Sequence, residues 1–186
     1  QPVAIDDVAT VDESSSGSTG SSNVINVVVI LDRSGSMGDD PDGAGGYATR
    51  LELAQAAINN MLALYGANGQ VNVLVVAFDS SSMASGWLTG SGSVAAAQTY
   101  VNNITLGGTT NYSSAIGTVQ AAYSHNTPPA DNTVLYFITD GVPTSGTSLT
   151  STNTVSVWEN FLTTNGISQA YAIGVNSAPL ASGPLD

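Results

Sequence analysis

The sequence predicts an α/β fold: a doubly wound, mostly parallel sheet that carries helices on both faces. Apolar runs of strand length recur along the chain, and segments with helical spacing of apolar residues separate them. The runs are nearly continuous instead of alternating, which is typical of strands that are covered on both faces. A sheet of this kind needs helices that cross from one parallel strand to the next.

The first two elements are predicted near the start of this pattern. A strand is expected at 24–31, a β-branched apolar run that only Asn26 interrupts. A helix is expected at 48–65, where apolar residues recur at spacings of three and four and Gly66 supplies a stop signal. The apolar face of that helix consists of Leu51, Ala54, Ile58, Met61 and Tyr65.

The later elements continue the alternation. Buried strands are predicted at 71–78 and 133–139, a last strand at 168–175, and a short edge strand at 86–89. Helices are predicted at 94–104, 112–123 and 155–164.

A change in composition near residue 23 predicts a domain boundary. Residues 1–22 hold an acidic segment and then a run of Ser, Gly and Thr, which is the composition of a flexible linker. The α/β domain is expected at 23–186.

The chain of 186 residues is strongly acidic and has no cysteine. It has 14 Asp and Glu against two basic residues, with a net charge of −12, which argues against nucleic acid and anionic membranes as partners. Such a charge favours surroundings in which divalent cations screen the carboxylates. The lack of cysteine excludes disulfides, thiolate metal sites and cysteine nucleophiles. No apolar run is long enough for direct insertion into a membrane.

Polar side chains follow the predicted strands at their carboxyl ends. They are Asp32, Ser34 and Ser36 after the first strand, Asp79 after the second, and Asp140 after the strand at 133–139. Ligands of open α/β sheets bind at this edge, where the strand order reverses. We therefore expect these side chains to converge on one binding site.

The chemistry of this edge suits a hard divalent cation, Mg²⁺ or Ca²⁺, because both prefer oxygen ligands. Asp32, Ser34 and Ser36 alternate on one loop, where Gly35 is expected to let the backbone bend. Asp140 would add a second carboxylate, and a threonine of "GGTTNY" a third hydroxyl. Two carboxylates and three hydroxyls leave a coordination position for water or for an oxygen of a ligand.

Three motifs of the sequence resemble the von Willebrand factor A domain family. They are "DRSGS" at 32–36, "TTNY" at 109–112 and "ITDG" at 138–141, which occur in the family's order over residues 23 to about 175. The resemblance implies a metal-ion-dependent adhesion site. Its ligands would be Asp32, Ser34, Ser36, Thr110 and Asp140.

The resemblance leaves two ligands of this site open. Counting from the glycine pair points to Thr109, whereas alignment of "TNY" points to Thr110, which we prefer because Asn111 and Tyr112 then match the family's motif. It also gives Asp79 a role in binding the ion through water.

Other interpretations of these residues exist. Ser34 and Ser36 taken alone are typical of a turn with a helix N-cap. A second acidic group can be a further calcium loop or, as we favour, a solvated loop; it consists of Asp39, Asp40 and Asp42. His125 is isolated and is interpreted as a surface residue.

The first residues carry a second resemblance. "PVAIDDVATVDE", at 2–13, is similar to the opening of calcium-dependent immunoglobulin-like or cadherin-like modules in bacterial repeats-in-toxin (RTX) adhesins. This resemblance implies a large surface adhesin with a role in biofilms, exported by type I secretion.

The family resemblance also implies a further strand and a last helix after residue 175. Residues 176–186 contain Pro179, Gly183 and Pro184 and are too few for both elements. We therefore expect the domain to be incomplete at its C-terminus and to be completed by a later segment of the same adhesin or by a neighbouring domain.

We expect a binding module and not an enzyme, because no general base and oxyanion stabiliser accompany the predicted metal. The ligand would be a protein or glycan on another cell or surface. The alternative function is a metal-stabilised scaffold that carries an adjacent or inserted ligand-binding domain, with no ligand at its own metal.

Overall fold

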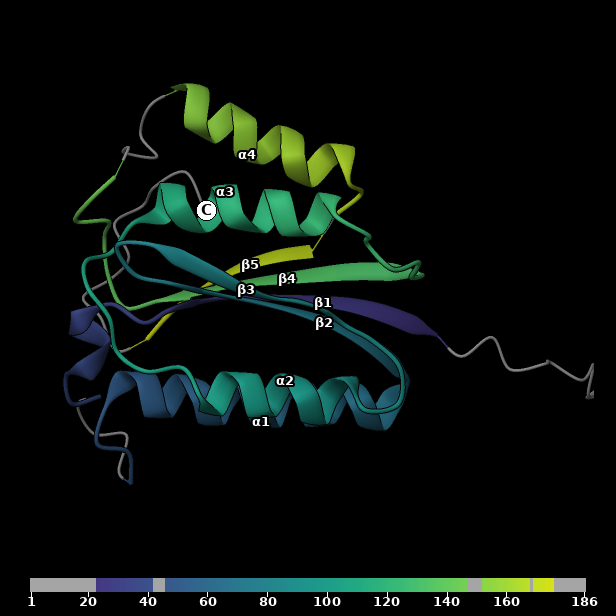
Figure 1. Ribbon diagram of the computed structural model, residues 1–186, viewed down its shortest axis with the longest axis horizontal. Coiled ribbons are helices and arrows are strands. Elements are labelled where there is room, and N and C mark those ends of the chain that lie inside the picture. Colours follow the sequence, from purple (N-terminus) through teal and green to yellow (C-terminus); the bar gives the residue numbers. More distant parts are fainter. Residues whose placement is uncertain (1–22, 42–45, 147–151, 168, 176–186) are drawn as a thin grey trace, which may run out of the picture.

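The computed structural model describes residues 23–41, 46–146, 152–167 and 169–175. They form a five-stranded sheet between two layers of helices, α1 and α2 on one face and α3 and α4 on the other (Figure 1). The strands are β1 (Val24–Asp32), β2 (Gln70–Phe78), β3 (Ser82–Leu88), β4 (Asn132–Thr139) and β5 (Gln169–Gly174). The helices are α1 (Arg50–Asn68), α2 (Ser93–Asn102), α3 (Tyr112–Ser124), α4 (Thr152–Thr164) and a 3-10 turn, η1 (Gly35–Gly38). The predicted fold class is confirmed.

The sheet has the strand order β3-β2-β1-β4-β5, with β1 at its centre. β1 pairs in parallel with β2 on one side and with β4 on the other, and β5 pairs in parallel with β4. Only β3 runs antiparallel, at one edge. The chain turns from one side of β1 to the other between β3 and β4, so the carboxyl ends of β1 and β4 flank the switch point.

The apolar runs became strands because both faces of the sheet are covered. On one face Val27, Val29 and Leu31 pack with the buried residues of α1 and α2. On the other face Val28 and Ile30 pack with those of α3 and α4. Alternate residues of β1 thus enter two separate cores, and this is why the sequence of the strand shows no polar alternation.

Helix α1 is one turn longer at its C-terminus than the sequence predicts. Gly66 does not end it but lies inside it, where an added Cβ would be 3.0 Å from Val94 of α2. The helix ends at Asn68, and Gly69 follows with an extended backbone. A Cβ at Gly69 would lie 2.7 Å from the carbonyl oxygen of Asn23, so close approach to β1 requires glycine there. Gly66 was mistaken for a stop because it is a packing glycine.

Strand β3 is longer than the predicted segment 86–89. It consists of Ser82–Leu88 and is only partly buried. Small and polar residues fill its first half, so no apolar run marks it in the sequence. Gly86 adopts a φ of 70°, close to an irregularity in the pairing with β2, which explains the interruption of the strand pattern.

Strand β5 is exposed along its whole length, and in the described part of the chain it pairs only with β4. The predictions for residues 1–22 and for a missing strand and helix after residue 175 fall outside the described residues. No helix within the described ranges is long and apolar enough to cross a membrane.

Candidate metal site

Asp32 ends β1 as a fully buried carboxylate. Its Oδ1 accepts a hydrogen bond from the Ser34 N–H at 2.8 Å, and its Oδ2 accepts one from the Thr139 hydroxyl at 2.6 Å. Burial raises the pKa of Asp32 above its usual value, against the opposing effect of these hydrogen bonds, and the neighbouring charge of Asp140 raises it further. The hydrogen bonds do not offset the cost of burying this charge, so a cation nearby would stabilise the carboxylate.

The two serines continue from Asp32 toward β4. Ser34 precedes η1, but its side chain makes no capping hydrogen bond, so the alternative interpretation as an N-cap is wrong for this residue. Its Oγ lies 3.2 Å from the Oγ of Ser36, and the Ser36 hydroxyl donates to Oδ1 of Asp140 at 2.9 Å. The predicted convergence of these four side chains on one edge therefore occurs in the structure.

Backbone hydrogen bonds hold the loop between β1 and η1. Gly35 follows this loop as the first residue of η1 and has no positive φ. Its N–H donates to the carbonyl oxygen of Gly108 at 2.8 Å, and the Gly107 N–H donates to the carbonyl oxygen of Arg33 at 2.7 Å. These bonds fix the loop of Ser34 against the segment that carries Thr110.

The two threonine candidates have different surroundings. Thr110 is buried, and its backbone binds the loop after β4 through Thr144 and Ser145. Its hydroxyl has no hydrogen-bond partner among the described residues. Thr109 is exposed, and its hydroxyl lies 2.7 Å from the Oγ of Ser145. The geometry favours Thr110, whose role as a ligand stays a prediction.

Asp79 ends β2 but is already fully engaged. Its Oδ1 accepts from Ser81, and its Oδ2 accepts from the Gly108 N–H at 3.0 Å and from Arg33 at 2.8 Å. Burial alone would raise the pKa of Asp79, but the hydrogen bonds from Ser81 and Gly108 and then the charge of Arg33 lower it. A Cβ at Gly107 would clash with this carboxylate, so only glycine fits beside it. A role through water remains a prediction.

The second acidic group is exposed where the structure describes it. Asp39 and Asp40 are exposed, and Asp42 lies outside the described residues. Within those residues, no three acidic or histidine side chains gather closely enough to hold a metal by themselves. The solvated-loop interpretation agrees with the exposure of Asp39 and Asp40.

The donor set as a whole fits a hard cation. It combines the carboxylates of Asp32 and Asp140 with hydroxyl oxygens of Ser34, Ser36 and Thr110, which are the ligand types that Mg²⁺ and Ca²⁺ prefer. Asp140, itself buried, accepts a hydrogen bond on its Oδ2 from Arg50 at 2.9 Å. A guanidinium thus already neutralises one of the two carboxylates, which shows that this position accommodates positive charge.

Sequence reasoning missed several groups of the site. Thr139 holds Asp32, Thr144 holds the backbone of Thr110, and Arg50 binds Asp140. One signal was available for Arg50: a basic residue is rare in this chain and is expected to lie beside a carboxylate.

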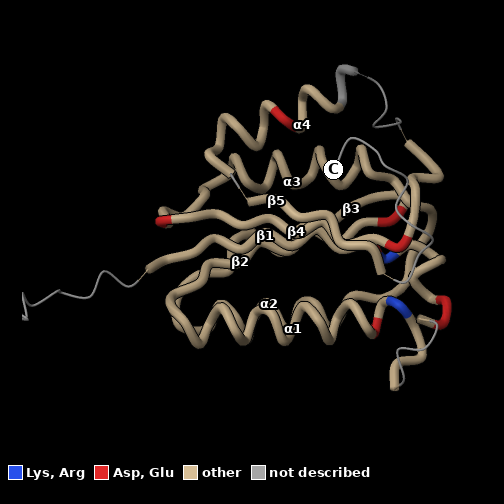
Figure 2. Tube along the Cα trace, turned by 180° about the vertical axis from the view of Figure 1, so that it is seen from behind, with Lys and Arg blue, Asp and Glu red and all other residues tan. Residues whose placement is uncertain are grey.

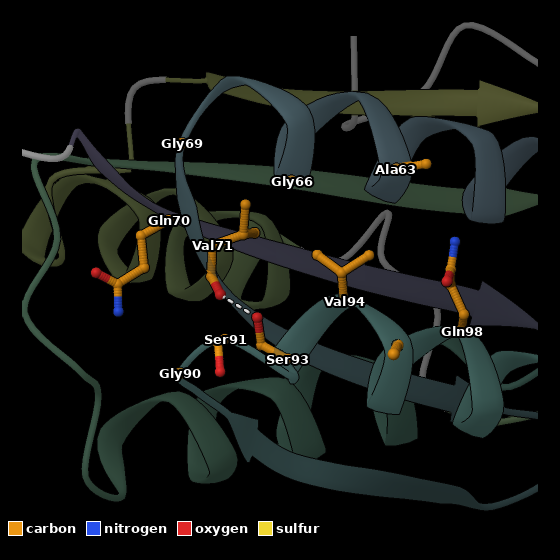
Figure 3. Close-up of a pocket in the computed structure, with 11 residues that line it drawn as sticks. Ala63, Gly66, Gly69, Gln70, Val71, Gly90, Ser91, Ser93, Val94 and Gln98 are labelled. Atoms are coloured by element: carbon orange, nitrogen blue, oxygen red, sulfur yellow. Dashed lines mark hydrogen bonds between the residues drawn. The ribbon is translucent and has the colours of Figure 1, made fainter.

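A cavity at the other end of the sheet is a different kind of feature. It measures about 710 Å³ and lies between the C-terminus of α1 and the start of α2 (Figure 3). No charged side chain lines it, and the Ser93 hydroxyl in it donates to the carbonyl oxygen of Val71. Its lining offers no carboxylate for a cation.

The family model of the von Willebrand factor type A domain matches residues 27–142, well over half of the chain. The chain belongs to this family. The match begins in β1 and ends just after Asp140, so it contains every predicted ligand of the metal site. No curated protein matches this von Willebrand factor A domain in sequence.

Several solved structures share the fold at low identity. The PilB minor pilin from Streptococcus sanguinis is 20% identical with a TM-score of 0.57, over 67% of this chain and 31% of that chain. An aerotolerance-related membrane protein from Bacteroides fragilis is 18% identical with a TM-score of 0.58, over 81% and 67% of the two chains. A von Willebrand factor type A protein from Catenulispora acidiphila is 20% identical with a TM-score of 0.54, over 81% and 32%. The domain thus spans about a third of the PilB chain.

Proposed function

We propose that this von Willebrand factor A domain is a non-enzymatic adhesion module that binds its partner through a divalent cation, Mg²⁺ or Ca²⁺. The ion would be held by Asp32, Ser34, Ser36, Thr110 and Asp140. One observation carries the proposal: short contacts link the carboxylate of Asp32 to that of Asp140, first through the Ser34 N–H and then through the hydroxyls of the two serines.

The charge of this donor set suits a ligand of acidic or oxygen-rich character. Two carboxylates balance a divalent ion, and hydroxyl ligands add no charge, so an anionic oxygen of a partner can complete the coordination. When bound, the cation supplies an attachment point for that oxygen. The remaining residues orient the site: Thr139 fixes the carboxylate of Asp32, and the Gly35–Gly108 backbone bond fixes the serine loop.

The wider setting of the proposal is a bacterial cell surface. The fold is shared with a minor pilin, and the first residues of the chain resemble modules of RTX adhesins. We infer a large secreted surface adhesin, exported by type I secretion and active in biofilms, whose ligand is a protein or a glycan on another cell or surface.

Titration calorimetry tests the metal site directly. The domain is expected to bind one Mg²⁺ or Ca²⁺, and Asp32→Ala is expected to weaken that binding by well over tenfold, because it removes a first carboxylate ligand. Glu159→Ala is the control, since it removes an exposed carboxylate of the same charge from α4, which carries none of the proposed ligands. Equal affinity of the wild type and Asp32→Ala would refute the assignment.

A second candidate function is the metal-stabilised scaffold. The exposure of β5 favours it, because Tyr171 and Ile173 present apolar side chains on a strand that pairs on one side only among the described residues. A neighbouring domain or segment of the same protein would cover this strand. A partner that is bound equally by the wild type and by the metal-free Asp32→Ala variant would favour the scaffold over the adhesion module.

A further inference from the structure

The only two basic residues of the chain lie at the same edge of the sheet. The sequence has 14 acidic residues, yet both arginines form ion pairs with buried carboxylates. Arg33 pairs with Asp79, and Arg50 pairs with Asp140. In Figure 2 both basic positions lie near several acidic ones at one end of the molecule, while other acidic positions lie elsewhere. This arrangement indicates that each guanidinium serves a specific carboxylate and not the surface in general.

Arg50 binds the same groups that are proposed to bind the metal. Its Nη1 donates to Oδ2 of Asp140 at 2.9 Å and to the carbonyl oxygen of Ser36 at 3.4 Å. The other oxygen of Asp140 accepts the Ser36 hydroxyl. The Asp140 side chain is 1% exposed and that of Arg50 is 16% exposed, so water screens this ion pair little.

We propose that Arg50 is an internal counterion that holds Asp140 while the metal is absent and that the divalent cation displaces it. This inference rests on the proposed metal site. Arg50 would thereby set the affinity of the site, because a cation must compete with the guanidinium for Asp140. It would also keep the metal-free site folded by neutralising one of two neighbouring carboxylates.

The geometry of the pair suits replacement. A strong arginine–carboxylate pair uses two parallel hydrogen bonds, but here Nη1 alone reaches Asp140. The Nε of Arg50 is buried without a hydrogen-bond partner in the described structure, which is a cost of the present arrangement. The contact neutralises Asp140 without satisfying the whole guanidinium, so a better ligand can take the carboxylate.

A second partner for Arg50 is already within reach. Oδ2 of Asp39 lies 3.5 Å from the same Nη1, and the Asp39 side chain is 66% exposed. The backbone N–H of Arg50 donates to the carbonyl oxygen of Asp39 at 2.9 Å, which keeps the two residues together. The guanidinium can therefore move from Asp140 to Asp39 by side-chain rotation, without a change in the start of α1.

The test compares the two arginines, which form a matched pair of equal charge. Arg50→Gln and Arg33→Gln each raise the net negative charge by one, but only Arg50 contacts a proposed metal ligand. Titration of the whole chain with Mg²⁺ should show that Arg50→Gln binds roughly three- to tenfold more tightly than wild type, because the cation no longer competes with a guanidinium that is little screened by water. Arg33→Gln should show a clearly smaller gain.

Thermal melts provide a readout that does not depend on a ligand. In chelator, Arg50→Gln should melt below wild type, because Asp140 then lacks its counterion. In saturating Mg²⁺ the difference should shrink or vanish, since the metal has replaced the guanidinium. If Arg50→Gln does not fold in chelator, Arg50→Lys, which keeps the charge, should fold. It should bind Mg²⁺ more tightly than wild type, but less tightly than a site in which no side chain competes with the metal for Asp140.

The outcomes separate this inference from the proposed metal site. If wild type binds Mg²⁺ and Arg50→Gln or Arg50→Lys binds it no more tightly, the counterion role is refuted and the metal site stands. An equal gain in Arg50→Gln and Arg33→Gln would also refute it, since net charge would then explain the effect. If wild type binds neither Mg²⁺ nor Ca²⁺, the metal site itself is refuted, and the displacement of Arg50 with it.

Discussion

The buried carboxylate of Asp32 carries an electrostatic cost in the metal-free site. It is fully buried, and its oxygens accept hydrogen bonds from Ser34 and Thr139 but contact no cationic side chain among the described residues. Because burial raises its pKa, the folded protein binds a proton at Asp32 more tightly than the unfolded chain does. This group therefore stabilises the metal-free protein at low pH and loses that contribution as the pH rises through its folded pKa.

Asp32→Asn should separate the folding role of this residue from its metal-binding role. In metal-free buffer at neutral pH the variant should be as stable as wild type or more stable, by on the order of 1 kcal/mol. The amide removes the buried charge while its oxygen can still accept from Ser34. As the pH falls toward the ordinary aspartate value of 3.8, the two proteins should converge.

Urea unfolding from neutral to acidic pH measures this difference, and Asp39→Asn is the control, since an exposed carboxylate gains little from the change. A variant less stable than wild type by the same amount at every pH would contradict the electrostatic explanation. Calorimetry on the same Asp32→Asn protein should show no tight metal binding.

The choice between Thr110 and Thr109 is also decided at single residues. Thr110→Val should lower metal affinity by about tenfold or more, since loss of an outer-sphere partner alone has that effect in metal sites. Thr109→Val removes only an exposed hydroxyl that contacts Ser145, so its affinity should stay near that of wild type. Equal loss in both variants, measured by titration with Mg²⁺, would contradict the assignment of Thr110.

At the scale of elements, the start of α3 positions this threonine. Asn111 is the N-cap: its Oδ1 accepts from the Ser114 N–H at 3.1 Å, and its own N–H donates to the carbonyl oxygen of Asp79 at 3.0 Å. Thr110 directly precedes the cap. The cap therefore links the helix, the end of β2 and the candidate ligand.

Asn111→Ala should lower the free energy of unfolding by about 1 kcal/mol, the usual cost of losing an N-cap side chain. It should also weaken metal binding, because the position of Thr110 relative to the start of α3 is then no longer fixed by the cap. Asn111→Ser is the control, since serine is also a good N-cap and carries no charge. Chemical denaturation and metal titration on both variants check this, and a destabilised Asn111→Ala domain with unchanged metal affinity would show that the cap does not position the site.

The accuracy of the sequence-based prediction also varies by element. β1, β2 and β4 were identifiable because helices cover both of their faces, so their residues are apolar throughout. β3 was recognised only in its second half, because an edge strand with one partner tolerates small polar residues. Its full length depends on pairing with β2, which is a tertiary contact.

The same distinction applies to the candidate site. Asp32, Ser34, Ser36 and Asp140 were predictable because each stands at or just after the end of a recognisable strand. Arg50 was not, since its contact depends on where the first turn of α1 meets the end of β4, 90 residues along the chain. The pairing of Thr139 with Asp32 likewise requires the lateral register of β1 against β4. Local pattern gives the strand ends, and packing decides which side chains face them.

At the scale of the whole molecule, charge and topology act together. With a net charge of −12, the acidic side chains of the folded state repel one another. Several buried carboxylates lie together at the carboxyl ends of the strands, where the strand order reverses. Two arginines neutralise Asp140 and Asp79, which leaves Asp32 without a cationic partner among the described residues. A divalent cation should therefore stabilise the fold as well as prepare the site for a ligand.

Calcium or magnesium should raise the melting temperature of the whole chain beyond any effect of ionic strength. A ligand that binds only the native state at 100 times its dissociation constant adds about 2.7 kcal/mol. For a domain of this size that corresponds to a shift of about 5–10 °C. Melts of wild type in chelator, in Ca²⁺ or Mg²⁺, and in NaCl of matched ionic strength measure the shift, and Asp32→Ala shows how much of it belongs to the site. Melts that coincide in chelator and in divalent salt would contradict this prediction, whereas an equal shift in Asp32→Ala would assign the stabilisation to general screening of the acidic surface.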